Sequence, residues 1–140
     1  MIRKATPADL KILTDLAIRL WPDYDRSDLS AQLTEIMEKD SAAFFLAGDW
    51  GFAQTQLRRD YVEGTEYSPV GYLEGIYVAE GNRRRGVARK LLAACKKWAR
   101  EQGCLEFASD CELDNAESYK FHLAMGFTEA NRIICFTQKL

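Results

Sequence analysis

The sequence predicts an α/β fold in which helices flank a mixed, mainly antiparallel sheet. Segments rich in β-branched and aromatic residues alternate with segments whose apolar residues recur at helical spacing. Their order is strand, two helices, three strands, helix, strand, helix, strand, which indicates layers of helices on a sheet. Because 140 residues bury a core without disulfides or metals, we expect residues 1–140 to form one domain.

Residues 1–20 predict a short strand followed by a helix. The strand covers Met1 to Lys4. Thr6, Pro7 and Asp9 form a helix start, because threonine caps, proline suits the first turn and an acidic residue suits the third position. The apolar residues that follow share one helical face: Leu10, Leu13, Leu16, Ala17 and Leu20.

A second helix is expected after Trp21-Pro22, which ends the first one. Ser27 is expected to cap this second helix. Its inward face comprises Leu29, Leu33, Ile36 and Met37. Trp21 itself has two interpretations: a core plug at a helix end, or an aromatic wall of a ligand pocket.

The next forty residues alternate in the manner of an antiparallel meander. Residues 42–47 and 50–59 predict two strands joined by a tight turn at Gly48-Asp49, and a polar loop leads to a third strand at residues 70–78. The loop and its approach carry the acidic residues Asp60, Glu63 and Glu66. These charges are either solvated or face a cationic substrate.

The connection after the third of these strands predicts an anion site. It carries Gly81, Asn82 and the arginines Arg83 to Arg85, and Gly86 then opens an amphipathic helix. Free N–H groups and the helix dipole favour an anion there, and glycine lets a phosphate approach the main chain. The Walker and Rossmann spellings of such a site are absent. The apolar face of the helix comprises Val87, Leu91, Leu92, Cys95 and Trp98.

The C-terminal part repeats the alternation. Residues 105–109 predict a strand, and a helix begins at Asp114-Asn115 and ends at Gly126-Phe127. Residues 132–138 predict a final strand. The buried face of the last helix is expected to comprise Phe121, Ala124 and Met125.

Composition excludes several classes of protein. The net charge of −2 gives no support to a nucleic-acid partner, because duplex binders usually carry a basic face. No apolar run is long enough for a membrane span, and the N-terminus lacks a signal-peptide pattern. Four cysteines without Cys-x-x-Cys spacing, and one histidine, predict neither a zinc site nor a disulfide framework. We therefore expect reduced thiols and a cytoplasmic location.

Several short motifs carry a resemblance to a known family. Arg83-x-x-Gly86-x-Ala88 resembles the acetyl-CoA signature of the GNAT superfamily of N-acetyltransferases, and the string Leu73-Glu74-Gly75-Ile76-Tyr77-Val78 resembles its aminoglycoside 6′-N-acetyltransferases. The similarity runs nearly end to end. Further matching strings are Leu20-Trp21-Pro22, Asp60-Tyr61-Val62-x-Gly64, Ser68-Pro69-Val70, Arg84-x-Gly86-Val87-Ala88, Ala108-Ser109-Asp110 and Met125-Gly126-Phe127. The resemblance implies a GNAT fold whose central strand splays at the acetyl-CoA site.

Acetyl-CoA is the co-substrate that the resemblance implies, with no metal. The family holds its pyrophosphate with residues that match Arg84, Arg85, Gly86, Val87, Ala88 and Arg89. Backbone groups at Ile76, Tyr77 and Val78 are expected to contact the thioester, and Gly75 is consistent with a local break in pairing. Asn115 matches a family contact to CoA.

Three side chains are expected to serve catalysis. An alkylammonium, with a reference pKa of about 10.4, must lose a proton before it attacks, and a nearby carboxylate can accept it. Glu74 and Asp110 match the pair that binds the substrate amine in this family, and which of them is the base stays open. His122 stands where many GNAT enzymes have the tyrosine that protonates the CoA thiolate. Tyr119 is a second candidate donor, and a plain helix-surface histidine is the alternative.

Substrate recognition is implied at five positions: Trp21, Tyr61, Glu74, Asp110 and Asn131. Aromatic faces stack on sugar rings, and carboxylates grip their ammonium groups. Asn131 departs from the pattern, because relatives carry an acidic residue there, whereas here Glu129 lies two residues earlier. The loss of that charge weakens or redirects the binding of a polycation.

These assignments predict transfer of the acetyl group from acetyl-CoA to the 6′-amine of aminoglycosides in a ternary complex, which confers antibiotic resistance. Two alternatives remain open: a GNAT enzyme for another small polyamine or a protein amine, and a non-catalytic acetyl-CoA-binding module. The resemblance also implies a homodimer in which the predicted strand 132–138 pairs across the interface.

Overall fold

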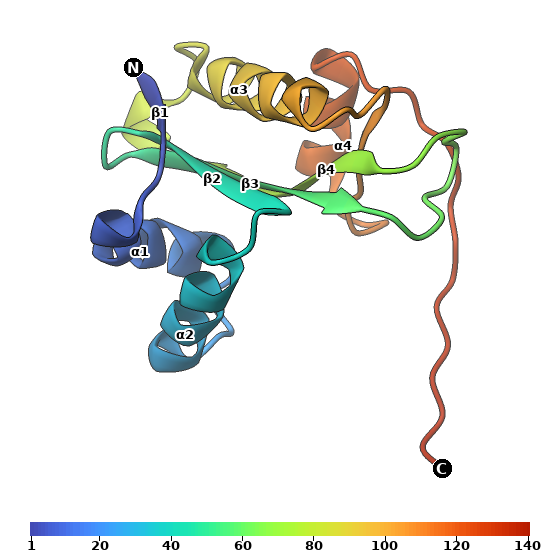
Figure 1. The fold of residues 1–140 in the computed structure, drawn as a ribbon, viewed down its shortest axis with the longest axis horizontal. Helices are drawn as coiled ribbons and strands as arrows, with labels where there is room; N and C mark the ends of the chain where they lie inside the picture. Colours follow the sequence, from blue (N-terminus) through green and yellow to red (C-terminus); the bar gives the residue numbers. More distant parts are fainter.

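A computed structural model describes residues 1–140 and contains one five-stranded sheet (Figure 1). The strands lie in chain order, and every neighbouring pair is antiparallel except β4 and β5, which are parallel. The expected mixed, mainly antiparallel sheet is therefore confirmed. The strands are β1 (Ile2–Lys4), β2 (Ala42–Ala47), β3 (Gly51–Arg58), β4 (Val70–Val78) and β5 (Phe107–Ser109).

Helices cover both faces of this sheet (Figure 1). They are η1 (Pro7–Asp9), α1 (Leu10–Leu20), α2 (Arg26–Met37), η2 (Glu80–Asn82), α3 (Val87–Glu101) and α4 (Ala116–Ala124). α1 and α2 lie on one face, while α3 and α4 lie on the other (Figure 1). None of these helices is both long enough and apolar enough to span a lipid bilayer.

Two of the three core clusters follow from the alternation of side chains along the strands. Leu46 and Phe52, which are cross-strand partners, face α1 and α2. Their neighbours Ala47 and Ala53 face α3, where small side chains let the helix pack closely. The second cluster also receives Phe121, Met125 and Phe127 from the C-terminal part of the chain.

The pairing of β4 changes at its middle. Thr55 pairs with Leu73 and Gln54 with Gly75, so Glu74 is an extra residue in the ladder with β3, as in a β-bulge. On the other side, β4 pairs with β5 only over Gly71–Leu73. The expected splay is confirmed, because the remainder of β4 has no strand neighbour on that side.

Two local expectations were wrong. Asp25, not Ser27, caps α2: its carboxylate accepts from the backbone N–H of Asp28 at 3.0 Å, and the helix begins at Arg26. Asp and Ser are about equally good caps, so spacing alone does not separate them. Ala124 is exposed, because α4 turns only Phe121 and Met125 toward the core.

The predicted final strand at residues 132–138 is also wrong. Residues 127–140 contain no helix or strand, and in Figure 1 this segment, in red, runs away from the sheet. Its apolar side chains remain in solvent, with Ile134 80% and Phe136 88% exposed. A strand-like pattern forms a strand only where a neighbour supplies hydrogen bonds, and this chain offers none here.

Gly71 provides a test of how closely β4 approaches α3. A Cβ there would lie 2.6 Å from the Cβ of Ala99 and 2.7 Å from Cδ1 of Phe107. We expect Gly71→Ala to lower the free energy of unfolding by about 1–3 kcal/mol, measured by urea titration, because overpacking forces strand and helix apart. Gly81→Ala is the control, since a Cβ at Gly81 meets no atom within 4 Å. Equal stability of the two variants would contradict this packing.

Candidate active site

The start of α3 presents unsatisfied backbone donors. Gly86 is its N-cap with φ of 74°, no side chain caps the helix, and the first turn has no acidic residue. Arg84, two residues before Gly86, also has a positive φ of 63°, which is uncommon outside glycine. Such a run of turned amides at a helix N-terminus binds anions through N–H groups and the helix dipole.

The arginines of this loop divide into two roles. Arg83 donates from Nε to the carbonyl of Val78 at 2.8 Å and so ties the loop to the end of β4. Arg84, Arg85 and Arg89 are exposed and take part in no ion pair. Three uncompensated guanidinium groups beside a helix N-terminus are electrostatically unfavourable unless an anion joins them.

Side chains near this loop are mostly used for packing. Ile76, Val87 and Ala88 pack against the second core cluster, so they have mainly backbone groups to offer a ligand. Tyr77 packs against the first cluster, below the guanidinium of Arg83 at 5.8 Å from its ring. Ile76 and Tyr77 can therefore contact a bound molecule through the β4 backbone that β5 leaves unpaired, whereas Val87 and Ala88 offer the backbone at the start of α3.

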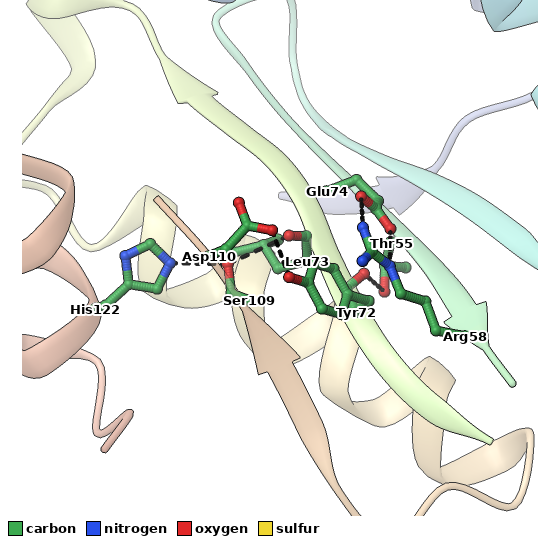
Figure 2. Close-up of polar contacts among 8 residues, drawn as sticks. All are labelled: Thr55, Arg58, Tyr72, Leu73, Glu74, Ser109, Asp110 and His122. Atoms are coloured by element: carbon green, nitrogen blue, oxygen red, sulfur yellow. Dashed lines mark hydrogen bonds and ion pairs between the residues drawn. The ribbon is translucent and has the colours of Figure 1, made fainter. Parts of the chain in front are cut away.

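Glu74 is held by an arginine that was not among the expected site residues (Figure 2). Arg58, the last residue of β3, donates to both carboxylate oxygens, from Nη2 at 2.8 Å and from Nε at 3.1 Å. Burial opposes the charge of Arg58, but the hydrogen bonds and charge of Glu74 outweigh it and raise the pKa of Arg58. This two-point pairing fixes the orientation of the carboxylate.

Tyr72 links this ion pair to Asp110 (Figure 2). The guanidinium carbon of Arg58 lies 3.4 Å from the centre of the Tyr72 ring, a cation–π arrangement. The Tyr72 hydroxyl donates to Oδ2 of Asp110. Burial, followed by the hydrogen bond to Asp110, raises the pKa of Tyr72 far above its ordinary value, so the hydroxyl remains a donor at neutral pH.

His122 is not a free surface side chain. Its Nδ1 lies 2.6 Å from the carbonyl of Ser118, and its Nε2 lies 2.8 Å from Oγ of Ser109. The ring also packs against Phe127, with ring centres 5.2 Å apart. Figure 2 shows Ser109 between the imidazole and β4. Tyr119, the other expected donor, is exposed.

Trp21 packs on the first core cluster, as its first interpretation expected, and it remains partly exposed. Its ring meets Phe52 edge to face at 6.1 Å, yet the residue stays half-buried. A Cβ on Gly75 would lie 2.6 Å from Cζ2 of this indole, so a glycine is needed here for the indole to approach β4. Gly75 also follows the bulged residue Glu74. The indole therefore packs on the core against Gly75, the residue that follows Glu74 on β4.

The remaining residues expected to bind substrate lie in the loop after β3 and the segment after α4. Tyr61 is 74% exposed. Asn131 donates from Nδ2 to Oε2 of Glu63 at 3.3 Å, so it meets the acidic loop rather than standing apart. Gly64 approaches Ala130 closely, since a Cβ there would lie 2.6 Å from that of Ala130.

Asn115 caps α4 by accepting from the backbone N–H of Ser118 at 3.1 Å, and its Nδ2 group remains available to a ligand. No group of three or more His, Cys, Asp or Glu side chains is placed to bind a metal ion.

The structure thus groups Glu74, Asp110 and His122 around the point where β4 and β5 separate. Sequence reasoning missed Arg58, Tyr72 and the role of Ser109, which complete this group. Tyr72 lies two residues before Glu74 on the same strand, and this spacing could have identified the tyrosine as a neighbour of the carboxylate. Arg58 carried no such signal, because its reach to Glu74 depends on the register of β3 against the bulge.

Comparisons with known proteins identify the family of this chain. The sequence model of the acetyltransferase (GNAT) family matches residues 10–127. Aminoglycoside N(6′)-acetyltransferase type 1 of Stenotrophomonas maltophilia is 44% identical, covering 99% of this chain and 93% of its own, and the protein of that name from Serratia marcescens is 42% identical, covering 89% and 90%.

Solved structures give the same result. AAC(6′)-Iy in complex with the bisubstrate analogue CoA-S-monomethyl-acetylneamine has a TM-score of 0.94 at 38% identity, covering 100% of this chain and 98% of its own. The aminoglycoside 6′-N-acetyltransferase AAC(6′)-Ig of Acinetobacter haemolyticus has a TM-score of 0.95 at 35% identity, covering 100% and 99%. The chain therefore belongs to the GNAT acetyltransferase family and, within it, to the aminoglycoside 6′-N-acetyltransferases.

Proposed function

We propose that this chain transfers the acetyl group of acetyl-CoA to the 6′-amine of aminoglycosides by direct attack in a ternary complex, and so confers resistance. Its relatives carry this activity in their names, and one similar structure holds CoA joined to a neamine derivative. The observation that carries the proposal is the separation of β4 from β5 after Leu73. It leaves one side of β4 unpaired between the anion-binding loop and the two carboxylates.

Acetyl-CoA is a substrate whose charge fits the start of α3. Its diphosphate suits the amides at Gly86, with Arg84, Arg85 and Arg89 as cationic partners. The backbone at Ile76–Val78 then lies along the path from this loop to Glu74, where an N–H donor would stabilise the charge that develops on the thioester oxygen. Asn115 offers its free amide N–H group from the start of α4.

The two carboxylates differ in their freedom to accept a proton. Both oxygens of Glu74 are engaged by Arg58, whereas Asp110 accepts only the Tyr72 hydroxyl, on Oδ2. Asp110 therefore has an oxygen available to take a proton from the substrate ammonium, directly or through water. Glu74 has a fixed position that suits the binding of that ammonium.

Aromatic and acidic groups around this point suit an amino sugar. Trp21 lies beside Gly75, while Tyr61 is exposed on the loop after β3. Glu63 reaches Asn131, so the segment after α4 and the acidic loop form one wall. Sugar rings stack on such aromatic faces, and their ammonium groups bind carboxylates.

A small substrate panel tests the reaction. We expect thiol release from acetyl-CoA with aminoglycosides that carry a 6′-amine and none with matched compounds that carry a 6′-hydroxyl, because the hydroxyl is not the nucleophile for which the site is built. Mass spectrometry of the product locates the acetyl group. Equal turnover of the hydroxyl compounds would contradict the proposed regiochemistry.

The carboxylates supply a second test. We expect Asp110→Asn and Glu74→Gln to lower the acetyl-transfer rate by roughly 10²–10⁴-fold, since each removes a group that handles the substrate ammonium. Acetyl-CoA affinity, measured by calorimetry, should stay near wild type. Glu35→Gln, an exposed carboxylate on α2, is the control and should leave the rate unchanged. A wild-type chain that binds acetyl-CoA but acetylates no amine would instead indicate a binding module.

We also propose that residues 1–140 form one domain that works in the cytoplasm as a homodimer. The four cysteines are free thiols, which suits a reducing compartment. The segment after residue 131 leaves large apolar side chains in solvent, and β5 pairs on one side only. An extended apolar segment and an open sheet edge are complementary, since a second copy can supply the missing strand neighbour.

The dimer proposal is tested in the full chain. Ile134 and Phe136 lie two residues apart and so share one face of an extended segment. Light scattering of the wild type should give about twice the chain mass of 16.0 kDa, and Ile134→Asp with Phe136→Asp should give about one such mass. Lys139→Gln is the control and should remain dimeric. A monomeric wild type would refute the proposal.

A further inference from the structure

Both ring nitrogens of His122 are already committed, which limits how this side chain can act. The Ser118 carbonyl at 2.6 Å only accepts, so Nδ1 must carry a proton whether the ring is neutral or charged. The neutral ring therefore has a bare Nε2, which accepts from the Ser109 hydroxyl at 2.8 Å. In the charged ring, Nε2–H donates to Ser109 instead.

Ser109 has two possible directions for its single proton. Its Oγ lies 2.8 Å from Nε2 of His122 and 3.3 Å from the carbonyl of Leu73 on β4. When His122 is neutral, the hydroxyl points to the ring. When His122 is charged, the ring donates to Oγ, and the hydroxyl then points to the carbonyl of Leu73 on β4. The charge of His122 thus determines where the Ser109 proton is offered.

The position of Ser109 places its hydroxyl proton near the point where β4 and β5 separate. Ser109 is the last residue of β5 and pairs with Leu73, immediately before the bulged Glu74. His122 lies behind it, enclosed by the rings of Phe121 and Phe127 at 5.6 and 5.2 Å. Of the two side chains, Ser109 is therefore the nearer to the point where β4 and β5 separate.

We propose that Ser109 relays the proton of His122 to the departing sulfur of CoA, so that His122 acts as a positioning and supplying group rather than as the direct acid. This inference rests on the proposed acetyl transfer. When the carbon–sulfur bond breaks, the electron pair leaves with sulfur. The Ser109 hydroxyl gives its proton to that sulfur and takes the Nε2 proton of His122, which ends neutral. The ammonium has meanwhile released two protons, one of them through Asp110, so that His122 regains one proton from solvent and one is released.

Rates of the chemical step test this relay. We expect Ser109→Ala to lower the single-turnover acetylation rate by about 100-fold, with little change in the affinity for either substrate. Ser109→Thr keeps a hydroxyl and should restore most of the rate. Ser68→Ala is the matched control, because it removes a serine hydroxyl that donates to a backbone carbonyl, that of Arg59, away from His122.

A double-variant cycle separates a relay from two independent effects. His122→Phe removes both nitrogens and keeps an aromatic ring between Phe121 and Phe127. Because the two groups act in series, the double variant Ser109→Ala with His122→Phe should be no slower than the slower of the two single variants. Multiplying rate losses, or a Ser109→Ala variant as fast as wild type, would overturn the relay.

Nuclear magnetic resonance gives a readout independent of turnover. Nitrogen-15 spectra of the neutral ring should show the proton on Nδ1 in wild type, and Ser109→Ala should shift the Nε2 resonance alone. A proton on Nε2 in the neutral wild type would overturn the relay. A wild-type chain that acetylates no aminoglycoside would refute the proposed function and the relay together, whereas transfer that survives Ser109→Ala would refute the relay alone.

Discussion

The site depends on one constraint: β4 must pair with both neighbours in its first half and leave one of them in its second half. Pairing with β5 ends at Leu73, and the extra residue Glu74 interrupts the ladder with β3 at the same level. A bulge increases local twist and re-aims side chains. Glu74, Ser109 and the start of the open β4 backbone therefore lie at the same level of the sheet.

The charges at this level are balanced within the protein before any substrate arrives. Arg58 holds Glu74 through two hydrogen bonds and rests on Tyr72, whose hydroxyl serves Asp110. A half-buried ion pair of this kind contributes little net stability, because desolvation offsets attraction, but it fixes geometry. An incoming ammonium would meet two oriented carboxylates of which only one is neutralised by a cation.

Features of this region that depend on neighbouring residues could be predicted from the sequence. Features that depend on contacts between distant segments could not. The start of α3 depends on residues adjacent in sequence, so spacing alone was enough to predict that Gly86 opens the helix beside a cluster of arginines. The partners of Glu74 and His122 depend on strand register and on the packing of α4, which a single sequence does not reveal. The prediction of a strand at residues 132–138 was wrong for the same reason, since a pattern of apolar residues does not show whether a neighbouring strand is present to pair with it.

The three arginines before α3 are adjacent in sequence but have different roles in the structure. Arg83 satisfies the carbonyl of Val78 and shapes the loop, which leaves Arg84 and Arg85 in solvent with Arg89 one turn later. Cations at a helix N-terminus oppose its dipole, so the loop carries unfavourable electrostatics by itself. An anion bound there removes that repulsion and satisfies free amides together. The fold thus holds in place an arrangement that a phosphate-bearing ligand makes more favourable.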